Sequence, residues 1–393
     1  MGRASRSLGP VTLEAVSDPR DADRGVLRIL LRIKGDATVR NRVKAVFAID
    51  VSPSMDGDRI FFAKYSVIKA IESLEPGDGV AIVPFCRTAW IAYKDASIDK
   101  ASTRKAVKTV ASLKTCYGTN IEAGLATASR ALRELGEGAG ALILVTDGEP
   151  NTGSRDPEKL ARLVDKGVAF IAVGVGSEYN EELLASIAER SSGRMTHVSE
   201  PEDLDKPILE EVTRAARLVA SRLRIIITPP EDASLRVLGW TANTTGNGVE
   251  LELGSLSSGE VLDIGLVLES SSMSGALGFE VTYTSPNGTS ERSILSIPLR
   301  ELMGPEEAEY AGYRISLLEA LEGVKEAIRG RDYRRAYEMI RQAAEATLSL
   351  GDEGLYEETI DIAELIRRGE AREASKKIYS TMFKARRERH DEA

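Results

Sequence analysis

Apolar runs that alternate with amphipathic helical segments constrain the fold of this chain more than any other feature. Residues 44–50 form an apolar run that ends in Asp50, and similar runs recur at 79–85, 141–146 and 168–175. A strand buried on both faces of a parallel sheet has this appearance. Amphipathic helices are predicted between and after the runs, at residues 59–74, 100–113, 121–135, 157–166 and 181–190. The alternation predicts an open, doubly wound, Rossmann-like α/β sheet. Residues 80–85 and 88–93 are too close together for a crossover helix, which predicts one edge hairpin.

A different pattern begins near Pro201. A helix is expected at 203–220, and short alternating strands separated by Gly, Ser, Asn and Pro follow it. This pattern is typical of an antiparallel β-sandwich. The alternating segments 11–16 and 25–33 do not fit the parallel sheet. We therefore expect them to complete the sandwich, so that the α/β domain is inserted between its first and later strands.

Strand signals disappear after residue 304, where Ala, Glu, Leu, Ile and Arg recur at helical spacing. Residues 328–336 and 366–374 resemble each other and predict two helical hairpin turns. A helical bundle that packs on the rest is favoured over a tetratricopeptide-type array, whose usual period is about 34 residues. The basic segment 384–390 is expected to end the last helix. The expected divisions are 1–41 for the N-terminal strands of the sandwich, 42–200 for the α/β domain, 201–221 for a connecting helix, 222–300 for the β-sandwich and 304–393 for a C-terminal α-helical domain.

Composition argues against several function classes. The formal net charge is −9, which gives no general attraction to nucleic acid or to an anionic membrane. The apolar runs are far shorter than the roughly 20 residues that span a bilayer. The first ten residues lack the apolar stretch of a secretory signal, so a cytoplasmic location is expected. Cys86 and Cys116 are expected to be free or buried thiols, with a redox link near the predicted site as the alternative.

Oxygen-bearing side chains follow two of the predicted buried strands. Asp50 ends the first run and is followed by Ser52 and Ser54, whereas Asp147 follows the run at 141–146. Thr119 lies in a Gly-containing turn before the helix at 121–135. In an open α/β sheet the carboxyl ends of the strands form the ligand-binding edge. Two carboxylates and three hydroxyls are hard donors that suit Mg²⁺ or a similar ion. Capping of the following helix is the alternative role for Asp50, Ser52 and Ser54.

The five residues resemble the metal-ion-dependent adhesion site of the von Willebrand factor A family. That site has the pattern D-x-S-x-S, then a distant Thr and a distant Asp, and this chain matches it with Asp50, Ser52, Ser54, Thr119 and Asp147. The resemblance covers about residues 42–200. It implies one Mg²⁺ ion, with Mn²⁺ or Ca²⁺ as alternatives, and an acidic residue of a partner protein that completes the coordination. Residue 53 is Pro where the family commonly has Gly, which stiffens the loop and removes one N–H donor.

We expect a metal-dependent protein-binding adaptor rather than an enzyme. A metal-dependent hydrolase is the first alternative, but no His, Lys or Cys near the motif is arranged to activate water. A surface adhesin exported by an unrecognised route is the second. The resemblance suggests a MoxR-type AAA+ ATPase or a signalling kinase or phosphatase as partner.

Overall fold

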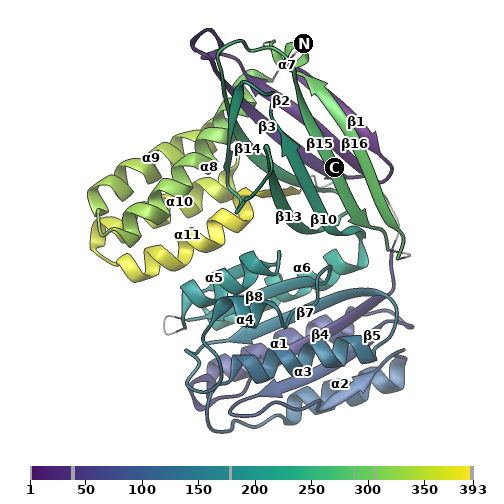
Figure 1. Ribbon diagram of the computed structural model, residues 1–393. Coiled ribbons are helices and arrows are strands. Elements are labelled where there is room, and N and C mark those ends of the chain that lie inside the picture. Colours follow the sequence, from purple (N-terminus) through teal and green to yellow (C-terminus); the bar gives the residue numbers. More distant parts are fainter. Residues whose placement is uncertain (1, 37–39, 177–178, 287, 305–306, 390–393) are drawn as a thin grey trace. The chain divides into compact units, whose positions relative to one another are not determined.

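The structure is a computed structural model that describes residues 2–36, 40–176, 179–286, 288–304 and 307–389. The chain forms two compact units, of which one is Thr38–Ser221 and the other joins Met1–Ala37 to Arg222–Ala393 (Figure 1). The predicted fold class, an α/β domain inserted in an antiparallel sandwich and followed by helices, is confirmed. Within the described residues, no helix has the length and apolar character needed to cross a membrane.

The inserted unit is built on one sheet with the strand order β6-β5-β4-β7-β8-β9. Neighbouring strands are parallel except β6, which pairs antiparallel with β5. The predicted edge hairpin is thus present, but its second strand begins at Tyr93, and Ala89 makes only an isolated bridge to Phe85. The strands are β4 (Val43–Asp50), β5 (Gly79–Phe85), β6 (Tyr93–Asp95), β7 (Ala139–Thr146), β8 (Ala169–Val175) and β9 (Arg194–Val198).

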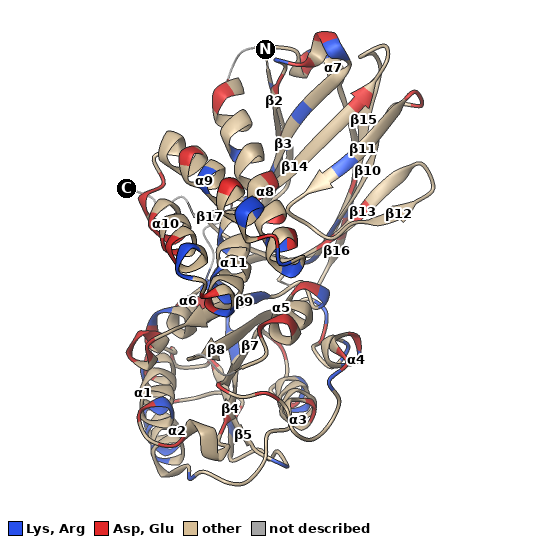
Figure 2. Cartoon of the chain, turned by 90° about the vertical axis from the view of Figure 1, so that its left-hand side faces the viewer, with Lys and Arg blue, Asp and Glu red and all other residues tan. Residues whose placement is uncertain are grey.

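Helices cover both faces of this sheet, with α1, α2 and α6 on one side and α3, α4 and α5 on the other (Figure 2). Their bounds are α1 (Asp58–Glu72), α2 (Lys100–Ser112), α3 (Ile121–Glu134), α4 (Pro157–Ala161), α5 (Glu181–Arg190) and α6 (Asp205–Ala216). Alternate residues of β4 face opposite layers, and Phe47 and Ile49 pack with the α1 side. All of β7 is buried. Burial on both faces explains the uninterrupted apolar runs, since each large aliphatic side chain gains about 1.5–3 kcal/mol.

Helix α6 belongs to the inserted unit rather than connecting two domains. The predicted helix at 203–220 is split into η3 (Pro201–Leu204) and α6, and the chain already forms strand from Leu218. Ile208 and Val212 of α6 lie in the same core as α1. An ion pair of 2.7 Å between Lys69 Nζ and Asp205 Oδ2 joins the two helices. The predicted helix at 157–166 is also shorter than expected and ends at Ala161.

The other unit is a sandwich of two antiparallel sheets. One has the path β1-β2-β3-β14-β11, with β17 also paired to β14, and the other has the order β12-β13-β10-β15-β16. Strand β3 pairs with β14 from Val26↔Glu269 to Lys34↔Val261, so the N-terminal strands complete the sandwich as predicted. The bounds are β1 (Arg3–Leu8), β2 (Val11–Asp18), β3 (Val26–Gly35), β10 (Leu218–Thr228), β11 (Ala233–Leu238), β12 (Asn243–Thr245), β13 (Gly248–Ser257), β14 (Glu260–Ser270), β15 (Ala276–Thr284), β16 (Ser290–Pro298) and β17 (Arg387–Arg389), with the short helix η1 (Ala22–Arg24) before β3.

The C-terminal helices pack on the sandwich. They are α7 (Leu299–Leu302), α8 (Ala308–Arg329), α9 (Tyr333–Leu350), α10 (Glu353–Arg368) and α11 (Ala371–Ala385). The two similar segments form the α8–α9 and α10–α11 turns, as predicted. Helix α11 contacts both α10 and α8, which closes a bundle instead of leaving an open array (Figure 1).

A buried carboxylate joins this bundle to the sandwich. Asp263 of β14 forms ion pairs with Arg32 of β3 at 3.1 Å and with Arg314 of α8 at 2.5 Å. Lys384 lies in the last turn of α11, as expected of the basic segment 384–390, but the helix stops at Ala385. Residues 387–389 instead form β17, which pairs with β14, and residue 390 lies outside the described residues. The bundle is therefore part of the same folded unit as the sandwich.

Candidate metal centre

Asp50 and Asp147 lie at the carboxyl ends of the two central strands. Asp50 is the last residue of β4, and Asp147 directly follows β7. The two strands are parallel neighbours, paired from Val43↔Ala139 to Ile49↔Val145. From β4 the chain moves outward to β5 and later returns to the other side through β7, so strand order reverses between them. This reversal is where open α/β sheets bind ligands.

The Asp50 carboxylate is completely buried and held by two donors. Its Oδ1 accepts a hydrogen bond from the Ser52 backbone N–H at 2.8 Å, and its Oδ2 accepts one from Thr146 Oγ1 at 2.6 Å. Burial raises the pKa of Asp50 to about 6; the bonds from Thr146 and Ser52 oppose the rise, and the nearby Asp147 charge adds to it. A buried carboxylate with this pKa is stabilised by any cation that binds beside it.

A chain of short contacts joins the other loop residues to Asp147. Ser52 Oγ and Ser54 Oγ are 3.0 Å apart, and Ser54 Oγ donates to Asp147 Oδ1 at 2.8 Å. Arg59 Nη1 donates to Asp147 Oδ2 at 2.5 Å. Asp147 is fully buried, whereas Ser54 is exposed. The group therefore extends from the interior of the sheet edge to its surface.

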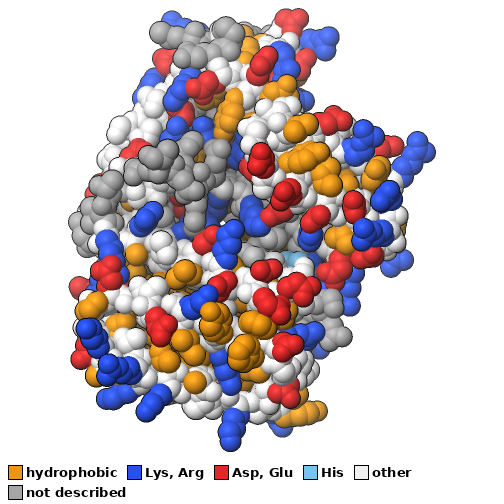
Figure 3. Space-filling view, turned by 180° about the vertical axis from the view of Figure 1, so that it is seen from behind, with side chains coloured by type: hydrophobic (Ala, Val, Ile, Leu, Met, Phe, Trp, Pro, Cys, Tyr) orange, Lys and Arg blue, Asp and Glu red, His pale blue; other side chains and the backbone are white. Residues whose placement is uncertain are grey.

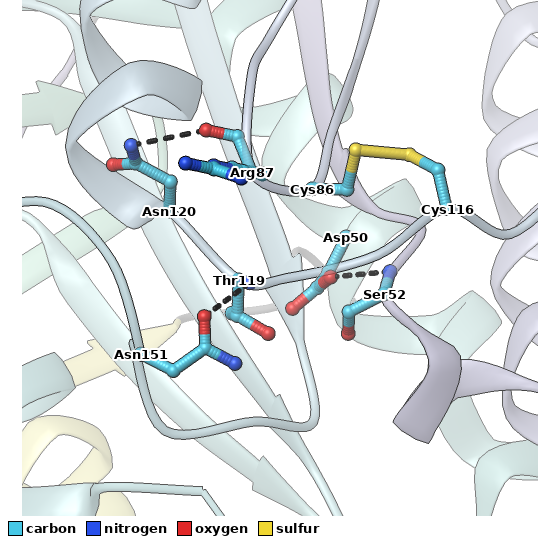
Figure 4. Close-up of a disulfide and its surroundings, with 8 residues drawn as sticks. All are labelled: Asp50, Ser52, Cys86, Arg87, Cys116, Thr119, Asn120 and Asn151. Atoms are coloured by element: carbon cyan, nitrogen blue, oxygen red, sulfur yellow. Dashed lines mark hydrogen bonds between the residues drawn. A yellow bond between two sulfur atoms is a disulfide. The ribbon is translucent and has the colours of Figure 1, made fainter.

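Thr119 reaches the site on a separate, firmly held turn. Its backbone N–H donates to Asn151 Oδ1 at 3.0 Å, and its carbonyl accepts the Asn151 N–H at 3.1 Å. Asn120 caps α3 by accepting the Ala123 N–H, and its Nδ2 donates to the Arg87 carbonyl at 3.2 Å. Figure 4 shows the side chains of Asp50, Ser52 and Thr119 gathered together. The turn is thus bound to two neighbouring loops.

Cys86 and Cys116 form a disulfide beside this turn (Figure 4). The expectation of free thiols is therefore wrong, and the alternative of a link near the site describes the arrangement. A backbone hydrogen bond also holds this segment, because the Cys116 N–H donates to the Val51 carbonyl at 2.7 Å. This hydrogen bond fixes the segment that leads to Thr119 against the loop between Asp50 and Ser52.

The geometry leaves room for a small ion among the oxygen atoms. A Cβ added to Gly148 would lie 3.5 Å from Ser54 Oγ and 3.6 Å from Thr119 Oγ1, so glycine keeps this space open. Two buried carboxylates with three hydroxyls are hard oxygen donors, which fits Mg²⁺, Mn²⁺ or Ca²⁺ better than a soft metal. Among the described residues, no cluster of three or more His, Cys, Asp or Glu side chains could hold a metal. The donor set therefore depends on the hydroxyls.

Nearby charged residues have other roles. Glu149 is exposed and lies 3.4 Å from Asn180 Nδ2 and 3.8 Å from Arg155 Nη1. His197 lies on the edge strand β9, and its Nδ1 is 2.8 Å from the hydroxyl oxygen of Tyr179. These contacts support the interpretation of Glu149 as a loop charge and of His197 as a structural residue.

Sequence reasoning missed three residues that organise the site. Thr146 binds Asp50, Asn151 positions Thr119, and Arg59 pairs with Asp147. Arg59 had a detectable signal, because a basic residue in the first turn of a helix opposes the helix dipole and indicates an acidic neighbour. Thr146 and Asn151 are not distinguished by any local pattern.

Comparisons with known proteins give a match in the inserted unit. The family description "von Willebrand factor type A domain" matches residues 45–214. The Escherichia coli (strain K12) protein YfbK is 29% identical over 206 residues, which is 50% of this chain and 35% of YfbK. The match thus spans little more than a third of that relative.

Two solved structures share nearly the whole fold. The von Willebrand factor type A protein from Catenulispora acidiphila has a TM-score of 0.69 at 16% identity, covering 91% of this chain and 92% of that chain. The ArnB paralog VWA2 from Sulfolobus acidocaldarius has a TM-score of 0.65 at 16% identity, covering 96% and 99%. At this identity the likeness concerns the fold alone. The family match by itself identifies residues 45–214 of this chain as a von Willebrand factor type A domain.

Proposed function

We propose that this protein is a metal-dependent adaptor, in which Asp50, Ser52, Ser54, Thr119 and Asp147 hold one Mg²⁺ ion that binds an acidic residue of a partner protein. The observation that carries this proposal is the convergence of the Ser52, Ser54 and Thr119 hydroxyls on the two buried carboxylates. Neutral hydroxyls leave much of the ion's charge uncompensated, which attracts a further carboxylate. Domains of this family typically mediate protein–protein interactions, and some carry such a metal site.

Exposed aromatic side chains near the site support a protein as the ligand. Tyr117, two residues before Thr119, is 82% exposed, and Phe61 in the first turns of α1 is 61% exposed. Elsewhere on the inserted unit, in the lower part of Figure 3, hydrophobic side chains lie between charged ones. Aromatic residues are enriched at the energetic centres of protein interfaces. A metal ion with Tyr117 and Phe61 on the neighbouring segments would offer a partner both charge and apolar contact.

Calorimetry tests metal binding. Wild-type protein stripped with EDTA should take up one Mg²⁺ per chain, and the Asp50→Ala/Asp147→Ala protein should take up none. Asp56→Asn is the matched control, because Asp56 lies in the same loop but is exposed and has no role in the proposed site. Equal heats for the wild type and the double variant would refute the proposed metal site.

Capture from a lysate tests the adaptor role. Partner binding should require Mg²⁺, fail in EDTA, and fail with Thr119→Ala. Tyr117→Ala should weaken capture but leave the Mg²⁺ affinity unchanged, whereas Tyr333→Ala in the helical bundle should change neither. Mass spectrometry of the captured protein would test whether the partner is a MoxR-type AAA+ ATPase or a signalling kinase or phosphatase. Capture that persists in EDTA and with Thr119→Ala would place binding on another surface.

A further inference from the structure

The guanidinium group of Arg59 occupies the edge of the candidate metal centre. Its Nη1 donates to Asp147 Oδ2 at 2.5 Å and to the Ser54 carbonyl at 3.2 Å. The Arg59 side chain is 28% exposed, whereas the Asp147 side chain is fully buried. A charge-assisted bond to a carboxylate that water does not reach is stronger than a surface ion pair. The contact is thus a substantial interaction within the candidate site.

The position of Arg59 in the fold is otherwise unfavourable. It lies in the first turn of α1, where the positive end of the helix dipole repels a cation. The guanidinium packs closely on the backbone of Gly176, the residue directly after β8. A Cβ added to Gly176 would lie only 3.3 Å from Arg59 Nη2. The side chain is therefore directed to the ends of β7 and β8, and the Asp147 contact offsets the cost of its location.

A divalent ion and Arg59 would compete for the same carboxylate. Asp50 and Asp147 supply two negative charges, and Arg59 already compensates one of them. An ion bound to Asp147 would lie within a few ångströms of the guanidinium, where two cations repel each other. Occupation by Mg²⁺ therefore opposes the ion pair seen here.

We propose that Arg59 is the built-in counter-ion of the metal-free site, and that a divalent ion binds by displacing its guanidinium from Asp147. This inference rests on the proposed function. With an ion bound, the displaced Arg59 would add one positive charge at the rim, beside an ion whose charge the neutral hydroxyls leave partly uncompensated. That charge matches a single acidic side chain of a partner. Arg59 thus sets the metal affinity of the site and stabilises it when no metal is present.

Magnesium titration of the full-length protein measures the competition. Arg59→Gln removes the competing charge and should tighten the dissociation constant for Mg²⁺ by roughly 10-fold or more, as expected for the loss of one charge-assisted hydrogen bond. Arg59→Lys keeps the charge and should remain within about threefold of wild type. Arg155→Gln is the matched control, because Arg155 lies 3.8 Å from Glu149 on the neighbouring loop. An unchanged or weaker affinity of Arg59→Gln would overturn the proposal.

Thermal unfolding provides a readout that does not depend on metal affinity. In EDTA, Arg59→Gln leaves the buried Asp147 without its cation and should lower Tm by about 5 °C. Under saturating Mg²⁺ this difference should nearly vanish, because the ion replaces the guanidinium. An equal loss of Tm in EDTA and Mg²⁺ would show a merely structural role and overturn the inference while leaving metal binding intact. If neither protein binds Mg²⁺, the proposed function itself is refuted together with the displacement.

Discussion

Removal of the Cys86–Cys116 disulfide should lower stability strongly and metal affinity hardly at all. The bond closes a loop between cysteines 30 residues apart, which contains β6 and α2. The double replacement Cys86→Ala/Cys116→Ala removes the link without leaving a single reactive thiol. Both side chains are at least partly buried, and Cys86 is in the core of the inserted unit.

The loop length determines the expected magnitude. Closing a loop of this size lowers the entropy of the unfolded chain by an amount worth about 3–4 kcal/mol at 25 °C. The folded geometry should change little, because the Cys116 N–H still binds the Val51 carbonyl at 2.7 Å and the Arg87 N–H binds the Tyr117 carbonyl at 3.0 Å. The dissociation constant for Mg²⁺ should therefore change by less than about threefold, since that change is well under 1 kcal/mol.

Urea unfolding followed by fluorescence measures the effect. The chain has two tryptophans, and Trp90 lies four residues after Cys86, so a Trp240→Phe background makes the signal specific to the inserted unit. With a denaturant slope of about 2–3 kcal/mol/M, the midpoint should fall by more than about 1 M. A coincident midpoint for the oxidised and the double-alanine proteins would refute the loop-closure argument. A large loss of Mg²⁺ affinity would instead show that the disulfide shapes the site.

Three further predictions concern other parts of the molecule. Asp263→Ala leaves the buried Arg32 and Arg314 without their shared carboxylate. The free energy of unfolding of the sandwich, measured by chemical denaturation, should fall by about 3–5 kcal/mol. A fall of less than about 1 kcal/mol would contradict the importance of this cluster. Removal of residues 304–393 deletes α8 and β17, so the sandwich should unfold as well. Circular dichroism of the shortened protein would show the loss of strands, and a native strand spectrum would contradict this prediction. The Asp50 carboxyl, whose pKa is raised to about 6, must lose its proton before a cation binds. The apparent Mg²⁺ affinity should therefore be constant above that pH and fall by about tenfold per pH unit below it. Calorimetry between pH 5 and 8 that shows no decline would exclude Asp50 from the site.

Much of the fold could be predicted from sequence because it is encoded in local patterns. The runs that form β4 and β7 are almost entirely apolar, because both faces of these strands are buried, and such a run is visible without any partner. Asp50 and Asp147 could be placed at one edge of the sheet because parallel strands share the direction of their carboxyl ends. The alternation of apolar and polar residues in β2 and β3 likewise indicated that these segments belong with the later strands of the sandwich.

Long-range pairings could not be predicted, because they depend on which surfaces meet after the chain has folded. The ion pair between Arg59 and Asp147 joins residues 88 apart, and either partner alone looks like an ordinary loop or helix charge. The sequence offered a link between Cys86 and Cys116 only as the alternative to free thiols, since two cysteines carry no periodicity. The contact of the Thr119 turn with the residues after β5 brings them together. Strand β17 reads as the charged end of a helix, and the open edge of β14 decides that it becomes a strand. Sequence by itself thus determined the buried strands and most of the helices through local hydrophobic periodicity, and strand direction placed Asp50 and Asp147 at one edge of the sheet. Tertiary structure decided the counter-ion, the disulfide and the attachment of the helical bundle, because each depends on contacts between segments that no local pattern connects.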